Sequence, residues 1–256
     1  MNSYVGFAQV YDALMDDIPY DIWSEYLVSL LREYGVEEGL LAELGCGTGS
    51  MTVRLREAGY DMIGIDNSEE MLLVAREKSD ESILYLNQNM EEMELFGTVR
   101  AFVSVCDSIN YLTDKSMLRE TFRKVNNYLD SGGVFIFDLK TEHFYRDILG
   151  NGVLAESRDE VSYIWDNIFD EESSINNYLL TLFIKNDLGE QCFTRFEEEH
   201  IQRAYSLGEI EECLEEAGME FVAAFDAFTR EPARADSERI YVVARETFQQ
   251  GKTYIE

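Results

Sequence analysis

Proline and histidine are scarce in this chain, and its cysteines are far apart. The 256 residues include 2 prolines, 2 histidines and 4 cysteines, with no CxxC pair. Two histidines and dispersed cysteines do not form a usual zinc site, so we expect no bound metal and no disulfide framework. Four reduced thiols fit a reducing compartment, and we expect a cytoplasmic protein.

Long apolar runs and basic residues are also lacking. No stretch of about 18 apolar residues occurs, which predicts no membrane-spanning helix. Residues 1–11 show no basic region followed by an apolar stretch, so no signal peptide is expected. The 21 Lys and Arg are outnumbered by 51 Asp and Glu, giving a formal net charge of -30. Such a surface repels phosphate and anionic lipid, which disfavours nucleic acid and membranes as partners.

The chain does contain strand-like apolar runs that alternate with amphipathic helical stretches. The apolar runs read as strands at 40–44, 62–65, 83–86, 101–105, 134–139, 219–225 and 239–244. Ser68 and Asp114 are placed as helix N-caps between them, and Gly132-Gly133 is predicted to end the unit before the fifth strand. This order predicts an α/β fold, a Rossmann-like and mostly parallel seven-stranded sheet with helices on both faces.

A different pattern interrupts this core. Residues 151–205 hold extended stretches rich in Tyr, Ile, Phe, Val and Thr, clearest at 161–169, 178–184 and 191–202, with a turn signal at 186–189. We interpret this segment as an inserted antiparallel β-sheet that covers the substrate side. The core then comprises residues 1–150 and 206–256, with residues 1–35 as an N-terminal helical lid. Ser206 and Glu209 fit a capping box where the core resumes.

The most informative segment is Glu43-Leu44-Gly45-Cys46-Gly47-Thr48-Gly49, between the first strand and the first core helix. Alternating glycines let the backbone turn tightly and touch a ligand. A dinucleotide-binding enzyme would carry the motif GxGxxG, but here Ser50 occupies the position of the motif's last glycine, and Glu43 would repel a pyrophosphate. Asp66, at the end of the second strand, can accept hydrogen bonds from both ribose hydroxyls. Together these features predict an adenosine-bearing, cationic ligand.

At these residues the chain resembles the class I S-adenosylmethionine-dependent methyltransferases. ELGCGTG (43–49) is similar to their first motif and IGIDNSEEML (63–72) to their second. YDALM (11–15) and DSINYL (107–112) resemble an uncharacterised bacterial subgroup, to which small-amine and amino-sugar N-methyltransferases are more distantly similar. The resemblance implies S-adenosylmethionine as cofactor, S-adenosylhomocysteine as product, and a small-molecule acceptor.

The resemblance also implies roles for individual positions. The glycines would cradle the methionine part, Glu43 would face its ammonium, and Asp66 would hold the ribose. Asn89 and Met90 would contact the adenine, Cys106 would lie beside the methionine part, and Tyr11 would cover the cofactor from the lid. The cofactor-binding candidates are Tyr11, Glu43, Gly45, Gly47, Gly49, Asp66, Asn67, Asn89, Met90 and Cys106.

Four residues are candidates for work on the acceptor. His200 could orient or deprotonate it, or could be a surface histidine among acidic neighbours. Asp107, Asn110 and Tyr111 follow the fourth strand, where a Rossmann-like sheet opens onto its ligand, but could equally form a capped turn. We predict in-line methyl transfer to nitrogen or oxygen. The alternatives are a nicotinamide-dependent oxidoreductase and a non-catalytic adenosine-ligand-binding protein. The sequence leaves the oligomeric state open, a homodimer being one option.

Overall fold

The computed structural model describes residues 7–16, 18–186, 192–248 and 252, with the backbone alone at residues 7 and 9. Among these residues, seven strands form a sheet in the order β10-β11-β5-β4-β1-β2-β3. Their bounds are β1 (Leu40–Leu44), β2 (Asp61–Asp66), β3 (Leu84–Asn87), β4 (Val99–Ser104), β5 (Leu129–Lys140), β10 (Met219–Asp226) and β11 (Arg239–Glu246). Strands β1 to β5 pair in parallel, and β11 runs antiparallel to β5 and β10. The mostly parallel seven-stranded sheet predicted from the sequence is confirmed.

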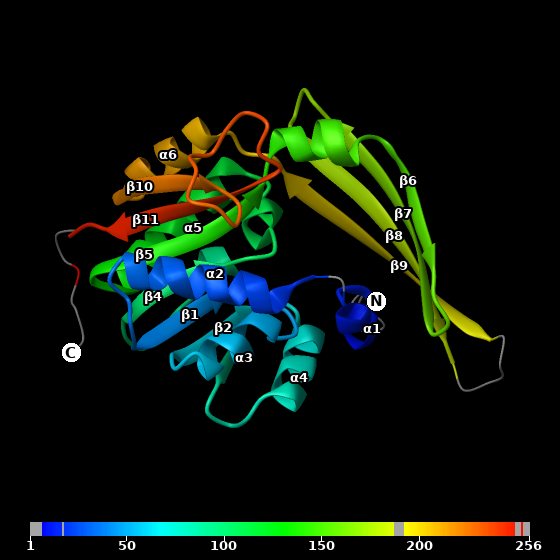
Figure 1. The fold of residues 1–256 in the computed structure, drawn as a ribbon, viewed down its shortest axis with the longest axis horizontal. Coiled ribbons are helices and arrows are strands. Elements are labelled where there is room, and N and C mark those ends of the chain that lie inside the picture. Colours follow the sequence, from blue (N-terminus) through cyan, green and yellow to red (C-terminus); the bar gives the residue numbers. More distant parts are fainter. Residues whose placement is uncertain (1–6, 17, 187–191, 249–251, 253–256) are drawn as a thin grey trace.

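Helices cover both faces of this sheet (Figure 1). On one face lie α2 (Tyr20–Glu33), α3 (Ser50–Glu57) and α4 (Glu69–Lys78), and on the other α5 (Lys115–Tyr128) and α6 (Leu207–Glu216). Leu27 of α2 packs in one apolar cluster with Val103 and Ile136, whereas Phe122 of α5 packs in another with Phe135. Because neighbouring residues of one strand enter opposite clusters, the central strands read as continuous apolar runs.

The helix starts follow the predicted caps. The Ser68 hydroxyl accepts the Met71 N–H at 3.2 Å, and the Asp114 carboxylate accepts the Ser116 N–H at 2.6 Å. Ser206 and its partner three residues later form the predicted capping box at the start of α6. These caps satisfy N–H groups that have no partner within the helix, which fixes where each helix begins.

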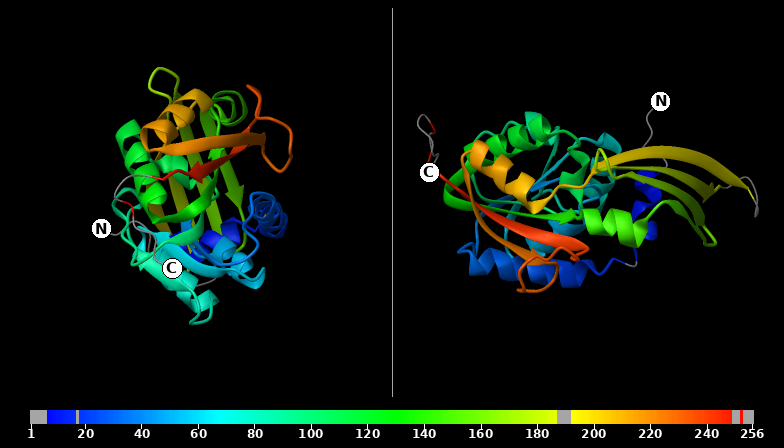
Figure 2. Two further views of the ribbon diagram at one scale, coloured as in Figure 1. Left: turned by 90° about the vertical axis from the view of Figure 1, so that its left-hand side faces the viewer. Right: turned by 90° about the horizontal axis from the view of Figure 1, so that it is seen from above.

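A second, four-stranded antiparallel sheet stands beside the core (Figures 1 and 2). Its strands lie in chain order as β6 (Gly152–Ser157), β7 (Val161–Asp170), β8 (Ile175–Lys185) and β9 (Phe193–Arg203). Helix α1 (Phe7–Leu14) lies between this sheet and α4, where Ala8 shares an apolar cluster with Met71 and Leu182. One face of the sheet therefore turns toward the core.

One prediction about an individual element needs correction. Gly132-Gly133 does not end a unit but lies inside β5, where the register against β4 shifts between Val99 and Ala101. The N-terminal stretch forms two helices: α2 packs on the sheet, and α1 lies against the antiparallel strands. The predicted turn at 186–189 and the start of the strand at 191 fall largely outside the described residues. No helix in the described part of the chain is long and apolar enough to cross a membrane.

Candidate functional site

The glycine-rich turn after β1 is held against the end of β2. The N–H groups of Gly45 and Cys46 both donate to the carbonyl of Ile65, at 2.8 and 3.1 Å. Gly45 has a φ of +68°, and a Cβ there would lie 2.5 Å from the Ser108 side chain. Only glycine fits this position, so the main chain itself forms the wall of the site.

Asp66 faces this turn from the end of β2. Its Oδ2 accepts the Gly47 N–H and its Oδ1 the Ser68 N–H, both at 2.8 Å. Burial raises the pKa of Asp66, although these hydrogen bonds oppose the shift. A carboxylate offers about four lone-pair directions, so both oxygens can still accept from a ligand. That geometry suits the two neighbouring hydroxyls of a ribose.

Glu43 supplies a second buried carboxyl group beneath the turn. It is 2% exposed and accepts a hydrogen bond from the Thr52 hydroxyl. Burial raises the pKa of Glu43 to about 8; the hydrogen bond from Thr52 opposes this shift, and the nearby Asp66 charge adds a smaller upward contribution. A cation placed nearby would stabilise the ionised form. The site therefore has a place for the ammonium of a bound amino acid group.

Amide side chains gather beyond Asp66. Asn67, Gln88 and Asn89 line the same cavity as Met90, which begins the short helix η1 (Met90–Glu92). The amides provide donors and acceptors, and the thioether provides an apolar surface. A purine ring needs both, which fits the predicted adenine contacts of Asn89 and Met90.

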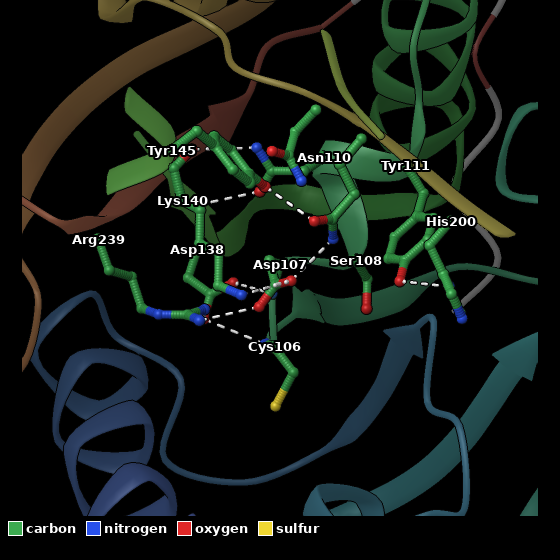
Figure 3. A network of polar contacts seen from close by, with 12 residues as sticks. Cys106, Asp107, Ser108, Asn110, Tyr111, Asp138, Lys140, Tyr145, His200 and Arg239 are labelled. Atoms are coloured by element: carbon green, nitrogen blue, oxygen red, sulfur yellow. Dashed lines mark hydrogen bonds and ion pairs between the residues drawn. The ribbon is translucent and has the colours of Figure 1, made fainter. Parts of the chain in front are cut away.

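The turn after β4 has an unusual backbone (Figure 3). Cys106 and Asp107 have φ values of +59° and +55°, which non-glycine residues seldom adopt. Both N–H groups donate to the Asp138 carboxylate, at 3.1 and 2.7 Å. Arg239 donates to Asp138 at 2.6 Å and to Asp107 at 2.8 Å. The buried ion pairs hold this turn in place at the carboxyl end of the sheet.

Asp107 lies at the centre of a set of charged and polar groups. Its Oδ2 accepts from Gln202 at 2.8 Å and lies 3.4 Å from the Lys140 Nζ. Burial raises the pKa of Asp107, but Lys140 and Arg239 outweigh burial and hold it below its ordinary value. Asp107 is therefore ionised at neutral pH and connects the strained turn to β9, which carries Gln202.

His200 does not lie on the surface, because only 5% of it is exposed. Its Nδ1 lies 3.0 Å from the hydroxyl of Tyr111 (Figure 3). That hydroxyl in turn lies 3.0 Å from the hydroxyl of Tyr178. The Tyr178 ring stacks on His200 with centroids 4.6 Å apart, and Trp165 stacks on the other side of Tyr178 at 4.2 Å. These rings form an aromatic wall on the inner face of the antiparallel sheet.

One cavity of about 500 Å³ joins the glycine-rich turn, Asp66, the strained turn and the aromatic wall. All but two of the site residues predicted from the sequence line it. Gly49 instead starts α3, where a Cβ would meet the Tyr85 hydroxyl at 2.7 Å. Asn110 is fully buried and bonds the main chain of Lys140 and Arg203, so it joins the short helix η2 (Ser108–Tyr111) to β5 and β9.

The sequence interpretation missed several residues that line this cavity. Tyr163, Trp165, Tyr178 and Leu180 face the cavity from β7 and β8. Lys140 and Arg239 reach it from β5 and β11, as do Tyr20 and Trp23 from α2. Alternation along β7 and β8 could have placed the aromatic residues on one face, although not on the face that meets the core. In the described part of the chain, no three His, Cys, Asp or Glu side chains are grouped to hold a metal ion.

Comparison with known proteins agrees with this geometry. A family model described as a methyltransferase domain matches residues 41–133. The chain is 36% identical to "Putative methyltransferase YqeM" of Bacillus subtilis, over 95% of this chain and 97% of that protein. It is 26% identical to a glycine/sarcosine N-methyltransferase of Aphanothece halophytica, over 70% of this chain and 67% of that one. The crystal structure of an S-adenosylmethionine-dependent methyltransferase from Clostridium acetobutylicum shares 28% identity and a TM-score of 0.84, covering 96% of this chain and 99% of that one.

The cofactor follows from the same observations. The buried Glu43 carboxyl, the bare main chain at Gly45 and the Asp66 carboxylate fit the ammonium, the methionine part and the ribose of S-adenosylmethionine. The comparisons support this cofactor and not a nicotinamide. The chain belongs to the class I S-adenosylmethionine-dependent methyltransferases.

Proposed function

We propose that this enzyme methylates a nitrogen atom of a small-molecule amine in the cytoplasm. The observation that carries this proposal is the cavity's second end, where Tyr111, Tyr178, Trp165 and His200 enclose a space next to the cofactor site. A volume of about 500 Å³ suits a cofactor and a small acceptor. The net charge of -30 argues against a nucleic acid acceptor.

The aromatic wall favours an amine over a neutral alcohol. A cation over an aromatic face gains about 0.5–2 kcal/mol, and the protonated form of an amine is such a cation. The cations at this end, Lys140 and Arg239, are compensated by Asp107 and Asp138, within 2.6–3.4 Å. These two cations and two carboxylates balance, so the aromatic rings are the feature of the acceptor subsite that favours a cation.

The amine must be neutral to act as a nucleophile. S-adenosylmethionine, when bound, supplies the methyl group on its sulfonium, and the leaving group needs no proton. Tyr111 lines the cavity and its hydroxyl lies 3.0 Å from His200 Nδ1, so a proton released by the amine can pass from Tyr111 to the imidazole. The glycine-rich turn, Glu43 and Asp66 position the methyl donor, and such positioning supplies much of the rate.

The N-methyltransferase relative from Aphanothece halophytica supports a nitrogen acceptor, because its glycine and sarcosine substrates are small amines. Its match extends over 70% of this chain. We propose the class of acceptor, a small primary or secondary amine, from the cavity and from this relative together.

The proposal is tested with S-adenosylmethionine labelled in its methyl group. Glycine, sarcosine, D-glucosamine and a wider panel of small primary and secondary amines are each paired with a hydroxyl counterpart, such as glycolate or D-glucose. We expect the label on at least one amine, with stoichiometric S-adenosylhomocysteine, and none on the hydroxyl compounds. Label on hydroxyl compounds alone, or on no amine, would contradict the proposal.

A further inference from the structure

Glu198 is a buried carboxyl group that the chemistry above does not use. It lies on β9 two residues before His200, on the same inward face, and is 2% exposed. Its cross-strand neighbour is Leu180, and Phe196 precedes it on that face. Both belong to the apolar cluster between α1 and the antiparallel sheet. The flanking Glu197 and Glu199 point outward and are exposed.

The contacts of Glu198 do not offset the energetic cost of burying its carboxylate. Neither carboxylate oxygen accepts a hydrogen bond from any described residue. Its Oε2 lies 3.3 Å from the Nε2 of His200, which is an ion-pair distance. Burying a carboxylate without hydrogen bonds destabilises a fold, so an apolar residue would stabilise this cluster better. A buried carboxylate that destabilises the fold is expected where its charge serves the functional site.

The contact completes a row of three groups. Tyr111 faces the cavity, His200 Nδ1 lies 3.0 Å behind its hydroxyl, and Glu198 lies behind Nε2. The negative charge of a carboxylate at this ion-pair distance electrostatically favours the imidazole tautomer with hydrogen on Nε2. Nδ1 is then left to accept the Tyr111 hydroxyl proton.

We propose that Glu198 is a positioning residue that fixes the His200 tautomer and stabilises its protonated form. The proposal rests on the proposed amine methylation. The amine gives a proton to the Tyr111 oxygen while the Tyr111 hydroxyl proton moves to His200 Nδ1. The imidazole becomes an imidazolium facing Glu198, and the neutral amine keeps the electron pair that forms the new N–C bond. The S–CH3 bond of a bound methyl donor would break in the same step and leave its electron pair on the sulfur of S-adenosylhomocysteine. The proton later leaves His200 for water.

Other ionisable groups also face this row. Tyr178 from β8 contacts the Tyr111 hydroxyl, and burial raises the pKa of Tyr178 well above its usual value. Tyr11 from α1 is likewise kept neutral by burial, which is the first cause of its raised pKa. Asp107 is the charged group on the far side, and it is neutralised by Lys140 and Arg239. Glu198 is therefore the carboxylate placed to compensate a positive charge on His200.

The kinetic test compares Glu198→Gln with Glu199→Gln, the same exchange one residue along on the exposed face. For the best amine of the panel, we expect Glu198→Gln to lower kcat about tenfold with KM changed less than about twofold. Glu199→Gln should match the wild type. His200→Asn should lower kcat about 100-fold, and Glu198→Gln should then add almost nothing. An unchanged kcat, or a loss that persists undiminished in the His200→Asn background, would overturn the proposal.

A second measurement needs no acceptor. The chain has 2 histidines, and His200→Asn assigns their ¹⁵N imidazole signals. His143 is an internal contrast, because its Nδ1 lies 2.8 Å from Asp147. We expect His200 to carry hydrogen on Nε2 in the wild type and to become a mixture of tautomers in Glu198→Leu, with an unfolding temperature no lower than that of the wild type. An unchanged tautomer, or a lower unfolding temperature, would assign Glu198 a merely structural role. If the tautomer shifts as expected but no amine is methylated, only the proposed acceptor class fails.

Discussion

Glu43 is a single residue whose ionisation links the stability of the fold to pH. Its carboxyl group is buried under the glycine-rich turn, and its pKa is raised to about 8 mainly by burial. The folded protein therefore holds this proton over a pH range in which the unfolded chain, with an ordinary pKa near 4.3, has lost it. Stability from the neutral carboxyl is fully present below the unfolded pKa and is lost as pH rises through about 8.

The pH dependence of the stability of the Glu43→Gln variant follows from the upward direction of this pKa shift. Glutamine imitates the neutral carboxyl at every pH, so the cofactor-free variant should gain stability over the wild type as pH rises. Between pH 5 and 8 the gain should approach about 1.4 kcal/mol per pH unit. Thermal unfolding at pH 5, 7 and 9 measures it, with exposed Glu57→Gln as control. A stability difference that is equal at all three pH values would contradict this account. S-adenosylmethionine should bind the Glu43→Gln variant more weakly at pH 8.

At the scale of elements, α1 connects the antiparallel sheet to the glycine-rich turn. Its Asp12 accepts the Thr48 hydroxyl at 2.7 Å and the Lys78 Nζ at 2.6 Å. Just beyond the helix, Asp16 pairs with Arg158 at 2.8 Å, beside the antiparallel strands. The two aspartates therefore attach α1 to different parts of the site, although neither faces the cavity.

This arrangement predicts that Asp12→Ala weakens cofactor binding from a distance. The Thr48 hydroxyl and the Lys78 ammonium lose a charged partner, and the glycine-rich turn becomes less ordered. A loss of about 1–1.5 kcal/mol corresponds to a roughly tenfold higher Kd for S-adenosylmethionine. Calorimetry measures it, with Asp16→Ala as the control on the other attachment. Equal Kd values for wild type and Asp12→Ala would show that α1 does not support the turn.

The elements that the sequence predicted well are those with local signals. Ser68 caps α4 and Asp66 ends β2 because a capping side chain and a strand end need only their neighbours. Because parallel strands end at the same edge, these signals also brought most of the predicted cofactor-binding residues to one cavity. The prediction that Gly132-Gly133 ends a unit was wrong because pairing of Leu129 with Val99 extends β5 through both glycines.

The acceptor side could not be predicted in the same way. Alternation marks Glu198 and His200 as sharing a face of β9, but not whether that face meets the core. Only the packing of α1 and η2 against the sheet decides it. Arg239 likewise reaches Asp107 through the pairing of β11 with β5, across 132 positions of sequence. Such long-range contacts leave no local pattern.

At the scale of the whole molecule, the dominant property is charge. A net charge of -30 creates a negative potential around the protein, which attracts cations. S-adenosylmethionine carries one more positive charge than S-adenosylhomocysteine, because transfer of the methyl group removes the sulfonium. The same protein field therefore favours the methyl donor over its product, in addition to any direct contact.

The salt dependence of binding can isolate this effect. The donor and its product share the adenosine, ammonium and carboxylate contacts, so the ratio of their Kd values reports the field at the sulfonium. Raising salt from about 0.05 to 0.5 M shortens the Debye length from roughly 14 to 4 Å and screens the distant acids. We expect the Kd of S-adenosylmethionine to rise about threefold or more, and that of S-adenosylhomocysteine by less than about 1.5-fold. A parallel rise for both would mean that the acidic surface does not act at the site. Discrimination would then have to come from groups that line the cavity, such as the aromatic rings of Tyr11 and Tyr20.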